Sequence, residues 1–241
     1  MLIIKRRTKN GLHVLMKGVQ MKELEMLQYV DHTLLKAVAT WDEIKTLCDE
    51  ATMYQTASVC VPACYIKRIH DTYGDKINIC TVVGFPLGYS TTKAKIAETE
   101  QALADGANEI DMVINITDLK NGDYQKVEDE IAALKKVVGG KILKVIIETC
   151  YLTEDEKIAM CKAVTNAGAD FIKTSTGFGT AGATPEDIKL FKEHIGPNVK
   201  MKAAGGVKSV DDLENFIQLG CARIGTSSAV NLVKGKLAKE Y

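Results

Sequence analysis

The sequence predicts an α/β fold in which eight strands and their helices close into a single-domain (β/α)8 TIM barrel. Short runs rich in branched apolar residues alternate with amphipathic stretches of helical period along nearly the whole chain. This alternation is typical of a parallel sheet, and eight repeats within 241 residues favour a closed barrel. An open doubly wound sheet is the alternative, but the GxGxxG fingerprint of its dinucleotide-binding members is missing after the first strand.

Strands are expected where branched and apolar residues gather between turn-forming residues. The expected strands are 29–33, 57–61, 78–85, 109–115, 141–149, 171–175, 199–203 and 221–225. Helices are expected between them, where apolar residues recur at helical spacing. The expected helices are a short one after Met21, then 40–54, 63–73, 92–105, 124–138, 153–166, one that opens at Pro185, 209–219 and 228–239.

Local signals at the helix ends support this assignment. Thr40 and Thr153 suit N-cap positions, because acidic residues that complement the helix dipole follow each of them. Pro185 suits the first turn of a helix. Similar glycine phrases end the helices before the fourth, sixth and eighth strands, as if one unit had been reused. They are Asp105-Gly106-Ala107, Ala167-Gly168-Ala169 and Leu219-Gly220-Cys221.

The chain is expected to form one domain with a short extension. No linker divides it, so residues 21–241 are assigned to the barrel. Residues 1–20 carry five basic side chains but lack the apolar core of a signal peptide. We interpret them as a dispensable N-terminal extension. No apolar run in the sequence is long enough to span a bilayer.

Composition limits the classes of partner. Lys plus Arg and Asp plus Glu each number 31, so the formal net charge is zero. This balance gives no reason to expect nucleic acid or an anionic membrane as a partner. The seven cysteines are scattered, with no CxxC pair and no second ligand pair at zinc-finger spacing. We therefore expect a reduced, cytoplasmic protein without a metal site.

Four consecutive strands each carry a charged residue in an apolar setting. These residues are Asp111, Lys144, Lys173 and Lys202. Any one of them alone would more safely be assigned to a solvated strand end. Neighbouring barrel strands converge, however, so inward-facing charges on strands four to seven would meet in one pocket. A pocket of interacting lysines and a carboxylate is a candidate functional site.

Lys173 is the candidate nucleophile of this pocket. It follows Phe171 and Ile172 in a buried strand, and a turn rich in hydroxyl groups follows it. An unperturbed lysine has a pKa of about 10.4 and is almost fully protonated at pH 7. Burial or a nearby cation favours the neutral amine, which can form a Schiff base with a carbonyl compound.

The turns after the last three strands suggest a phosphate site. Each combines glycine with small or hydroxyl residues, and Ser209 and Ser228 lie where helices begin. The three turns are Thr174-Ser175-Thr176-Gly177, Ala204-Gly205-Gly206-Val207 and Gly225-Thr226-Ser227-Ser228. Backbone N–H groups in the late turns of a barrel commonly bind phosphate. Each motif alone is weak, but three in succession favour a phosphorylated ligand.

Taken together, these motifs resemble the deoxyribose-phosphate aldolase family. The resemblance covers residues 25 to 235, and the order of the motifs makes it specific. It rests on Asp31-His32-Thr33-Leu34-Leu35, Lys144-Val145-Ile146-Ile147-Glu148-Thr149, Lys173-Thr174-Ser175-Thr176-Gly177-Phe178, Lys202-Ala203-Ala204-Gly205-Gly206-Val207 and Gly225-Thr226-Ser227-Ser228. It implies a class I aldolase that reversibly cleaves 2-deoxy-D-ribose 5-phosphate to D-glyceraldehyde 3-phosphate and acetaldehyde, without metal or organic cofactor. It also suggests a homodimer.

The resemblance implies a role for individual residues. Lys173 matches the Schiff-base lysine, Lys202 the second lysine that keeps it nucleophilic, and Asp111 an acid/base aspartate that works through a water molecule. The residues that match the substrate site are Asp31, Thr33, Cys60, Lys144, Gly177, Gly205, Gly206, Ser227 and Ser228. Cys60 is equally well explained as a small buried hydrophobe. Phe178 stands where some relatives carry a lysine, Lys208 keeps a charge nearby, and Tyr241 matches a mobile C-terminal tyrosine.

Two other functions remain open at the level of sequence. A different Schiff-base aldolase of phosphosugars, or a transaldolase, would share the barrel, and the fold alone does not separate them. A non-catalytic barrel that binds a phosphorylated ligand would keep the turns without the chemistry. The joint presence of Lys173, Lys202 and Asp111 argues against this second alternative.

Overall fold

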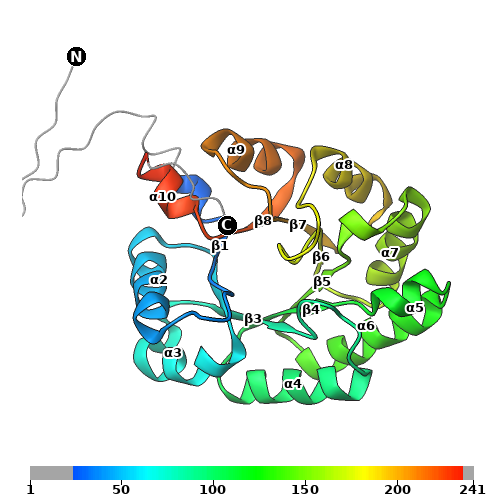
Figure 1. Cartoon of the computed structure of the whole chain (residues 1–241), viewed down its shortest axis with the longest axis horizontal. Coiled ribbons are helices and arrows are strands. Elements are labelled where there is room, and N and C mark those ends of the chain that lie inside the picture. The colour runs from blue at the N-terminus through cyan, green and yellow to red at the C-terminus, as the bar shows by residue number, and fades with distance from the viewer. Residues whose placement is uncertain (1–23, 236–241) are drawn as a thin grey trace, which may run out of the picture.

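A computed structural model, which describes residues 24–235, shows a closed barrel of eight parallel strands. The strands follow one another around the barrel in chain order, and β1 pairs with both β2 and β8 to close it (Figure 1). The strands are β1 Val30–Thr33, β2 Ser58–Val61, β3 Ile79–Val83, β4 Glu109–Val113, β5 Ile142–Ile146, β6 Phe171–Lys173, β7 Lys200–Ala204 and β8 Cys221–Thr226. The predicted TIM-barrel fold is confirmed.

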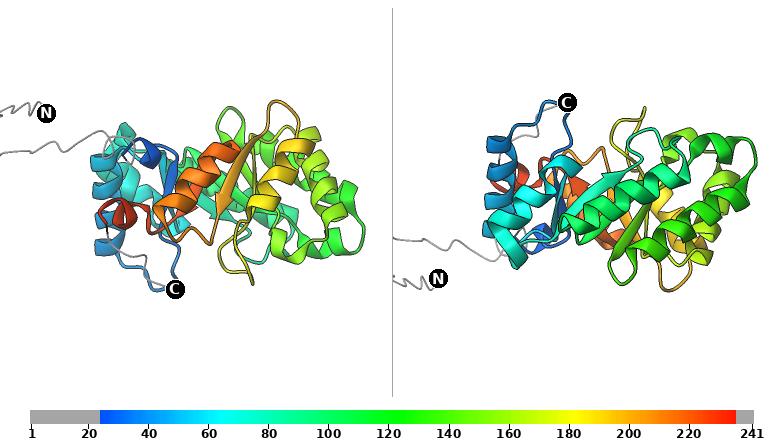
Figure 2. Two further views of the ribbon diagram at one scale, coloured as in Figure 1. Left: turned by 90° about the horizontal axis from the view of Figure 1, so that it is seen from above. Right: turned by 90° about the horizontal axis from the view of Figure 1, so that it is seen from below.

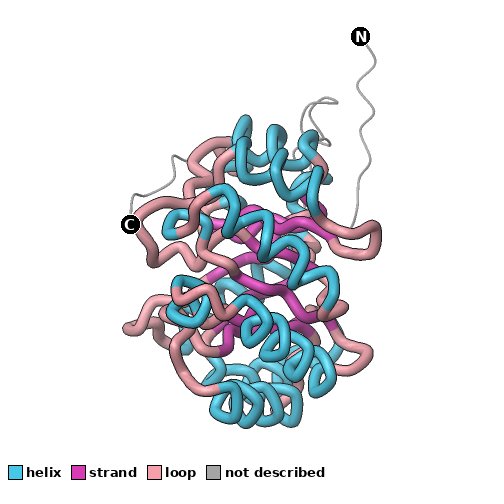
Figure 3. The backbone as a smooth tube through the Cα atoms, turned by 90° about the vertical axis from the view of Figure 1, so that its right-hand side faces the viewer, coloured by secondary structure: helices cyan, strands magenta, loops and turns pink. Residues whose placement is uncertain are grey.

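Helices surround the barrel and connect its strands. Figures 2 and 3 show them as an outer layer with the strands between them. The α-helices are α2 Trp41–Tyr54, α3 Ile66–Tyr73, α4 Thr92–Ala104, α5 Ile116–Lys120, α6 Tyr124–Val138, α7 Glu154–Asn166, α8 Pro185–His194, α9 Val210–Leu219 and α10 Ala229–Val233. Short 3-10 helices are η1 Ala63–Tyr65, η2 Gly74–Lys76 and η3 Thr149–Tyr151.

The predicted capping signals operate in the structure. Thr40 and Thr153 each form a capping box with a glutamate three residues later, and Ser209 forms one with Asp212. These reciprocal bonds satisfy backbone N–H groups that a helix leaves unpaired in its first turn. Gly220 ends α9 with a φ of 107°, a conformation that side chains disfavour. The helices therefore begin and end where the local chemistry requires.

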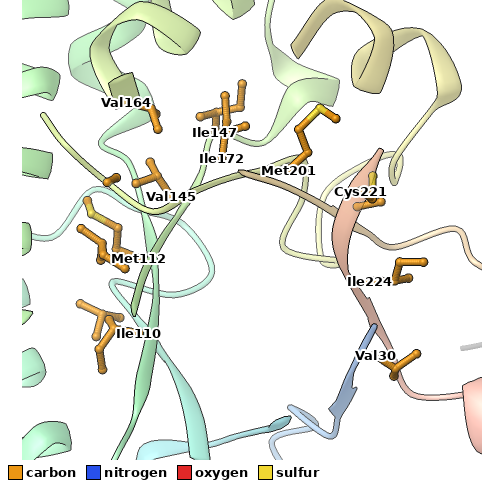
Figure 4. Packing of buried hydrophobic residues seen from close by; sticks show 14 of the residues in the cluster. Val30, Ile110, Met112, Val145, Ile147, Val164, Ile172, Met201, Cys221 and Ile224 are labelled. Carbon is orange, nitrogen blue, oxygen red and sulfur yellow. The ribbon is translucent and has the colours of Figure 1, made fainter. Parts of the chain in front are cut away.

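The main apolar core lies between the strands and the helices. Along β4, Ile110 and Met112 point to the outer face, where Val145 and Ile172 of neighbouring strands join them (Figure 4). Side chains alternate between the two faces of a strand, so Glu109 and Asp111 lie on the other face, inside the barrel. The outer face thus supplies the stability of the fold, and the inner face is free to carry polar groups.

A buried ion pair between two helices contacts the end of β4 on the outer face of the barrel. Lys95 of α4 is fully buried and lies 2.8 Å from Glu130 of α6. Its amine also donates to the carbonyl oxygen of Val113 at 2.8 Å. Loss of one partner would leave the other charge buried without compensation. The pair therefore holds two helices against the end of the strand that carries Asp111.

Several predicted boundaries were wrong. Strand β6 ends at Lys173 rather than at residue 175, and β5 ends at Ile146 rather than at 149, because the left-handed residue Glu148 breaks the strand. Helix α10 ends at Val233 rather than at 239. Lys234 and a left-handed Gly235 follow Val233, and residues 236–239 of the predicted helix lie outside the described residues. Helix α5, capped by Asn115, was not predicted. Residues 24–27 are helical as expected, and the proposed extension, 1–20, lies outside the described residues.

Within the described part of the chain, no helix has both the length and the apolar character needed to cross a membrane.

Candidate active site

The four charged residues predicted to converge do meet inside the barrel. Asp111 on β4, Lys144 on β5, Lys173 on β6 and Lys202 on β7 are all buried. Oδ2 of Asp111 lies 2.7 Å from the amine of Lys173 and 2.7 Å from that of Lys202. Oδ1 lies 2.8 Å from the amine of Lys144. One carboxylate thus accepts hydrogen bonds from three lysines on three successive strands.

The register of the sheet explains this convergence. Asp111 is level with Lys144 across β4 and β5, and Lys173 is level with Lys202 across β6 and β7. The second pair lies nearer the carboxyl ends of the strands, because Lys173 is level with Ile146, two residues beyond Lys144. Lys173 is also the least buried of the three lysines, with 3% of its surface exposed against 0% for the others. It is therefore the amine nearest to the open end.

Further carboxylates complete the network, and the sequence pattern indicated only some of them. Asp31 on β1 is fully buried and pairs closely with Lys202, and its Oδ1 accepts from the hydroxyl of Ser58 at 2.8 Å. Glu109 lies 2.6 Å from the amine of Lys144. Arg223 on β8 lies 3.0 Å from Glu109. The interior therefore holds three carboxylates and four cationic side chains.

Glu109 and Arg223 were missed although the sequence carried a signal for both. Glu109 lies two residues before Asp111, and Arg223 lies two residues before Gly225. Asp111 and Gly225 both face the interior of the barrel. Side chains two apart share a strand face, so both could have been assigned to the interior. Asp31 is predicted, by resemblance, to belong to the substrate site. In the structure its side-chain partners include Ser58, Lys144, Lys202 and Arg223.

These contacts set the protonation states of the network. Burial alone would raise the pKa of Asp111, but Lys144, Lys173 and Lys202 hold it well below the usual value. Burial alone would lower the pKa of Lys202, but Asp111 and Asp31 outweigh burial and raise it. The same balance raises the pKa of Lys144. Lys144 and Lys202 are thus ammonium groups and Asp111 is a carboxylate at neutral pH.

Cys60 lies beside this network together with a second cysteine. Cys60 on β2 is level with Cys80 on β3, and Cys80 donates to Oδ1 of Asp111 at 3.1 Å. The sulfur atoms of both and one carboxylate oxygen of Asp111 lie within 4.8 Å of one another, the spacing of a metal site. Asp111 is already engaged by three amines, two of them ammonium groups, which disfavour a further cation. The set fits a metal ion poorly.

A cavity of about 260 Å³ opens at the carboxyl ends of the first three strands. Its lining includes Leu35, Val82 and Phe85, which also pack around Cys60 and Cys80. None of the three lysines belongs to the lining. The cavity therefore lies beside the charged network and not over it. Thr33, at the end of β1, is half-buried and donates to the carbonyl oxygen of Asp31 at 2.8 Å.

The three late turns, residues 174–177, 204–207 and 225–228, pack together at the same end of the barrel. The hydroxyl of Thr174 accepts from the N–H of Ala204 at 3.1 Å. A Cβ atom added to Gly205 would lie 3.6 Å from Cα of Gly177, so the first two turns are in contact. Gly177, Gly205 and Gly206 all have positive φ, which glycine adopts without strain. The hydroxyl of Ser228 donates to the carbonyl oxygen of Val207 at 3.4 Å, which joins the third turn to the second.

The remaining predicted residues lie around this group of turns or beyond the described chain. Ser227 lies in the third turn, between Thr226 and Ser228. Phe178 is exposed and packs edge-to-face on Phe85, with ring centroids 5.3 Å apart. Lys208 is exposed at the start of α9, where its N–H donates to Asp212. Tyr241 lies outside the described residues.

A (β/α)8 barrel with buried lysine amines around a carboxylate at its open end is the architecture of a barrel enzyme equipped for carbonyl chemistry. The family model described as DeoC/LacD family aldolase matches residues 25–231. This chain belongs to that family.

Relatives are similar over nearly their whole length. The deoxyribose-phosphate aldolase of Clostridium botulinum (strain Alaska E43 / Type E3) is 75% identical over 221 residues, which are 92% of this chain and 100% of that protein. The deoxyribose-phosphate aldolase of Clostridioides difficile (strain 630) is 58% identical over 90% of this chain and 99% of its own. The tetrameric deoxyribose phosphate aldolase of Aeropyrum pernix matches with a TM-score of 0.82 and 28% identity, over 88% of this chain and 91% of its own.

Proposed function

We propose that this chain is a class I aldolase that reversibly cleaves 2-deoxy-D-ribose 5-phosphate to D-glyceraldehyde 3-phosphate and acetaldehyde. Its membership of the DeoC/LacD aldolase family and its 75% identity to a deoxyribose-phosphate aldolase support this activity. One structural observation carries the assignment of the nucleophile. The amine of Lys173 is the least buried of three, and it lies 2.7 Å from the carboxylate of Asp111.

In this mechanism the neutral amine of Lys173 attacks the C1 aldehyde of the open-chain sugar. Loss of water gives a protonated imine, which is an electron sink. A base removes the proton from the C3 hydroxyl, the C2–C3 bond breaks, and its electrons move into the imine to form an enamine. D-Glyceraldehyde 3-phosphate leaves. A proton then adds to C2, and hydrolysis of the imine releases acetaldehyde and restores Lys173.

Asp111 is the group proposed to manage the proton at the C3 hydroxyl. Its lowered pKa keeps it ionised but makes it a weak base, which favours action through a water molecule. An ammonium group at Lys173 has three N–H bonds and a protonated imine has one. Imine formation therefore reduces the hold of Lys173 on Oδ2, and this oxygen becomes available to the hydroxyl or to water.

Lys202 and Lys144 are proposed to supply fixed positive charge. Both have raised pKa values, because carboxylates outweigh the effect of burial. Lys202 shares Oδ2 of Asp111 with Lys173, so its ammonium group competes with Lys173 for that oxygen and leaves the Lys173 amine less firmly held. Asp31 is proposed to hold Lys202 in place, and Lys144 to hold Asp111. Thr33 and Cys60 are proposed to border the substrate on the side of β1 and β2.

The late turns are the proposed site of the phosphate group. Gly177, Gly205 and Gly206 allow close approach of an anion to the backbone, and Ser227 and Ser228 add hydroxyl donors. Contact between the three turns supports this proposal, because one phosphate can reach donors from all of them. Phosphate bound there would fix the distal end of the sugar while the aldehyde meets Lys173.

Two experiments test the proposed function. The first measures acetaldehyde release from deoxyribose 5-phosphate, with and without a chelator. Cleavage unaffected by the chelator is expected of a lysine-based aldolase, and loss of cleavage in chelator would overturn that assignment. The second adds acetaldehyde and sodium borohydride and maps the modified peptide. An ethyl group on Lys173 is expected, whereas a label on another lysine would reassign the nucleophile, and no label would indicate a non-catalytic barrel.

The oligomeric state and the cellular location of the protein are also proposals. We propose a homodimer, as the family resemblance suggests, although the relative from Aeropyrum pernix is a tetramer. Analytical ultracentrifugation distinguishes the two. We also propose a cytoplasmic location, supported by the free cysteines among the described residues, seven in number.

A further inference from the structure

Glu148 occupies a conformation that its residue type disfavours. It follows β5 with φ 55° and ψ 67°, in the left-handed region. Within residues 24–235, the other non-glycine residue with positive φ is Gln55, which ends helix α2, a common place for this conformation. Glu148 is instead the N-cap residue of the short 3-10 helix η3, a position that normally has extended backbone, and only 2% of its surface is exposed. A strained, buried glutamate persists only where surrounding contacts determine its position.

Those contacts lead to the turn after β6. The two carboxylate oxygens of Glu148 lie 3.2 and 3.3 Å from the N–H of Thr176, and Oε2 also accepts a short hydrogen bond from the Thr176 hydroxyl. The same hydroxyl accepts from the N–H of Phe178 at 3.0 Å. Burial raises the pKa of Glu148, and the bonds from Thr176 oppose this rise. The carboxyl group thus fixes both the backbone and the side chain of Thr176.

The segment around Glu148 is packed closely against the same turn. A Cβ atom added to Gly179 would lie 3.1 Å from Cδ of Glu148 and 2.9 Å from the sulfur of Cys150. The N–H of Thr149 also donates to the carbonyl oxygen of Thr174 at 2.9 Å. The turn 174–179 is therefore held from the β5 side at both ends. Its other side, at Gly177, faces Gly205 of the next turn.

We propose that Glu148 is a positioning residue that sets the turn 174–179 for the phosphate of the substrate, and thereby determines the preference for phosphorylated sugars. This inference rests on the proposed function. The carboxyl group has no direct role in bond cleavage. It holds Thr176, and through Thr176 it fixes Gly177, whose backbone meets the phosphate. Without this carboxyl group, the turn would be free to shift, and the affinity for the phosphate group would fall.

The test compares deoxyribose 5-phosphate with unphosphorylated 2-deoxyribose. For Glu148→Ala we expect kcat/KM for the phosphorylated sugar to fall by about tenfold or more, mostly through KM, as expected for loss of bonds to a charged group. The concentration of inorganic phosphate that inhibits half of the activity should rise by a similar factor. Activity on 2-deoxyribose should change by less than about threefold. Equal losses on both sugars, or a fall in kcat alone, would overturn the proposal.

Further variants separate this role from a general effect on folding. Thr176→Val keeps the shape of the side chain and removes the hydroxyl, so it should reproduce part of the loss. The double variant Glu148→Ala with Thr176→Val should lose no more than the worse single variant, because both belong to one contact. Glu148→Gly removes both the backbone strain and the carboxyl group. We expect this variant still to lose the preference for the phosphorylated sugar. Full independence of the two single variants would contradict the proposed contact.

Glu156→Gln is the matched control. Glu156 also accepts from a threonine N–H, but its bonds go to Thr153, the N-cap of α7, and to Lys120, the last residue of α5. We expect Glu156→Gln to leave the ratio of kcat/KM for the two sugars unchanged. A changed ratio in this control would show that the ratio reports general destabilisation. If the wild-type protein cleaved neither sugar, the proposed function would fail. If it cleaved both and Glu148→Ala kept the wild-type ratio, only the role of Glu148 would fail.

Discussion

The amines of Lys173 and Lys202 each lie 2.7 Å from the same atom, Oδ2 of Asp111. The two amines therefore share one carboxylate oxygen. Lys202 has a second carboxylate partner, Asp31, and Lys173 has none among its ion pairs in the described chain. Lys202 is therefore the more firmly held of the two amines, and Lys173, with fewer ionic contacts and a more open position, is the amine that is freer to meet a carbonyl group.

The first prediction concerns Lys202. In Lys202→Leu the fixed positive charge beside Lys173 is absent, and the carboxylates of Asp31 and Asp111 lose a partner. We expect slower imine formation near neutral pH, by about tenfold or more, with partial recovery as the pH rises. Stopped-flow trapping with acetaldehyde across a pH series measures this. A profile scaled down equally at every pH would contradict the role. Lys200→Leu, an exposed position on the same strand, is the control and should retain the wild-type profile.

The second prediction concerns Lys173 itself. We expect Lys173→Ala to abolish turnover, to below a few per cent of wild-type activity, and to leave the barrel folded. Removal of a buried amine also removes the cost of its desolvation, so the fold need not suffer. Circular dichroism and thermal unfolding check the fold, and acetaldehyde release checks turnover. Substantial activity in a folded variant would require another nucleophile.

The barrel and its central lysines could be predicted because their signals are local. A strand of alternating pattern places Asp111 inside, and the order of the strands brings Lys144, Lys173 and Lys202 around it. The pairing of Asp31 with Lys202 depends on closure of the barrel between β8 and β1, which joins residues 171 positions apart. The sequence therefore indicated too few carboxylates around Lys202, and it gave no sign that the pKa of Lys202 is raised.

The conformation of Glu148 could not be predicted from sequence. Glutamate gives no sign of a positive φ, and the contact with Thr176 depends on how the ends of β5 and β6 pack. The boundary of α10 was missed for a different reason. Gly235 is a residue type that commonly ends helices, and its left-handed conformation ends α10 here, after Val233 and Lys234.

The third prediction links acid stability to Glu50. The N–H of His32 donates to its carboxylate at 3.0 Å, and Lys234 lies 2.9 Å away. The His32 hydrogen bond lowers the pKa of Glu50 from 4.5 to about 2, against the effect of burial, with a further contribution from Lys234. The resulting stabilisation is present above the unfolded pKa and is lost as the pH falls through 4.5 towards 2.

We therefore expect Glu50→Gln to reduce the free energy of unfolding by about 1 kcal/mol at pH 7, since the pair is partly exposed. The difference from wild type should shrink as the pH falls below 4.5. Urea unfolding at a series of pH values measures both effects. Glu193→Gln, at an exposed position on α8, is the control and should follow the wild type. A difference that stays constant down to the lowest measurable pH would exclude the pKa shift as its source.

The fourth prediction concerns the N-terminal residues. The alignment with the Clostridium botulinum relative covers all of that protein with 221 of the 241 residues here, and the family model begins at residue 25. We expect deletion of residues 1–20 to leave kcat/KM for deoxyribose 5-phosphate within about twofold of wild type, since the site network begins at Asp31. Steady-state kinetics and the unfolding temperature of the two forms measure the effect. A large loss of either would assign the extension to the folded domain.

The last prediction concerns the phosphate group. The late turns offer backbone and hydroxyl donors but few fixed charges, since Phe178 carries no charge and Lys208 is exposed. The dianion is therefore expected to bind chiefly to N–H groups, through charge-assisted hydrogen bonds of about 1.5–3 kcal/mol each. An added negative charge in these turns would repel it directly. Ser228, which joins the third turn to the second through Val207, is a suitable place for that charge.

We expect Ser228→Asp to lower kcat/KM for deoxyribose 5-phosphate by two or more orders of magnitude, about 3 kcal/mol. Cleavage of unphosphorylated deoxyribose should change little, because that sugar carries no charge to repel. Ser228→Ala, which removes the hydroxyl without adding charge, separates repulsion from loss of a donor and should lie between wild type and Ser228→Asp. The measurement is a set of steady-state rates for the three proteins on both sugars. Equal losses on the two sugars in Ser228→Asp would mean that the phosphate binds elsewhere, because repulsion at the true site acts only on the sugar that carries the phosphate.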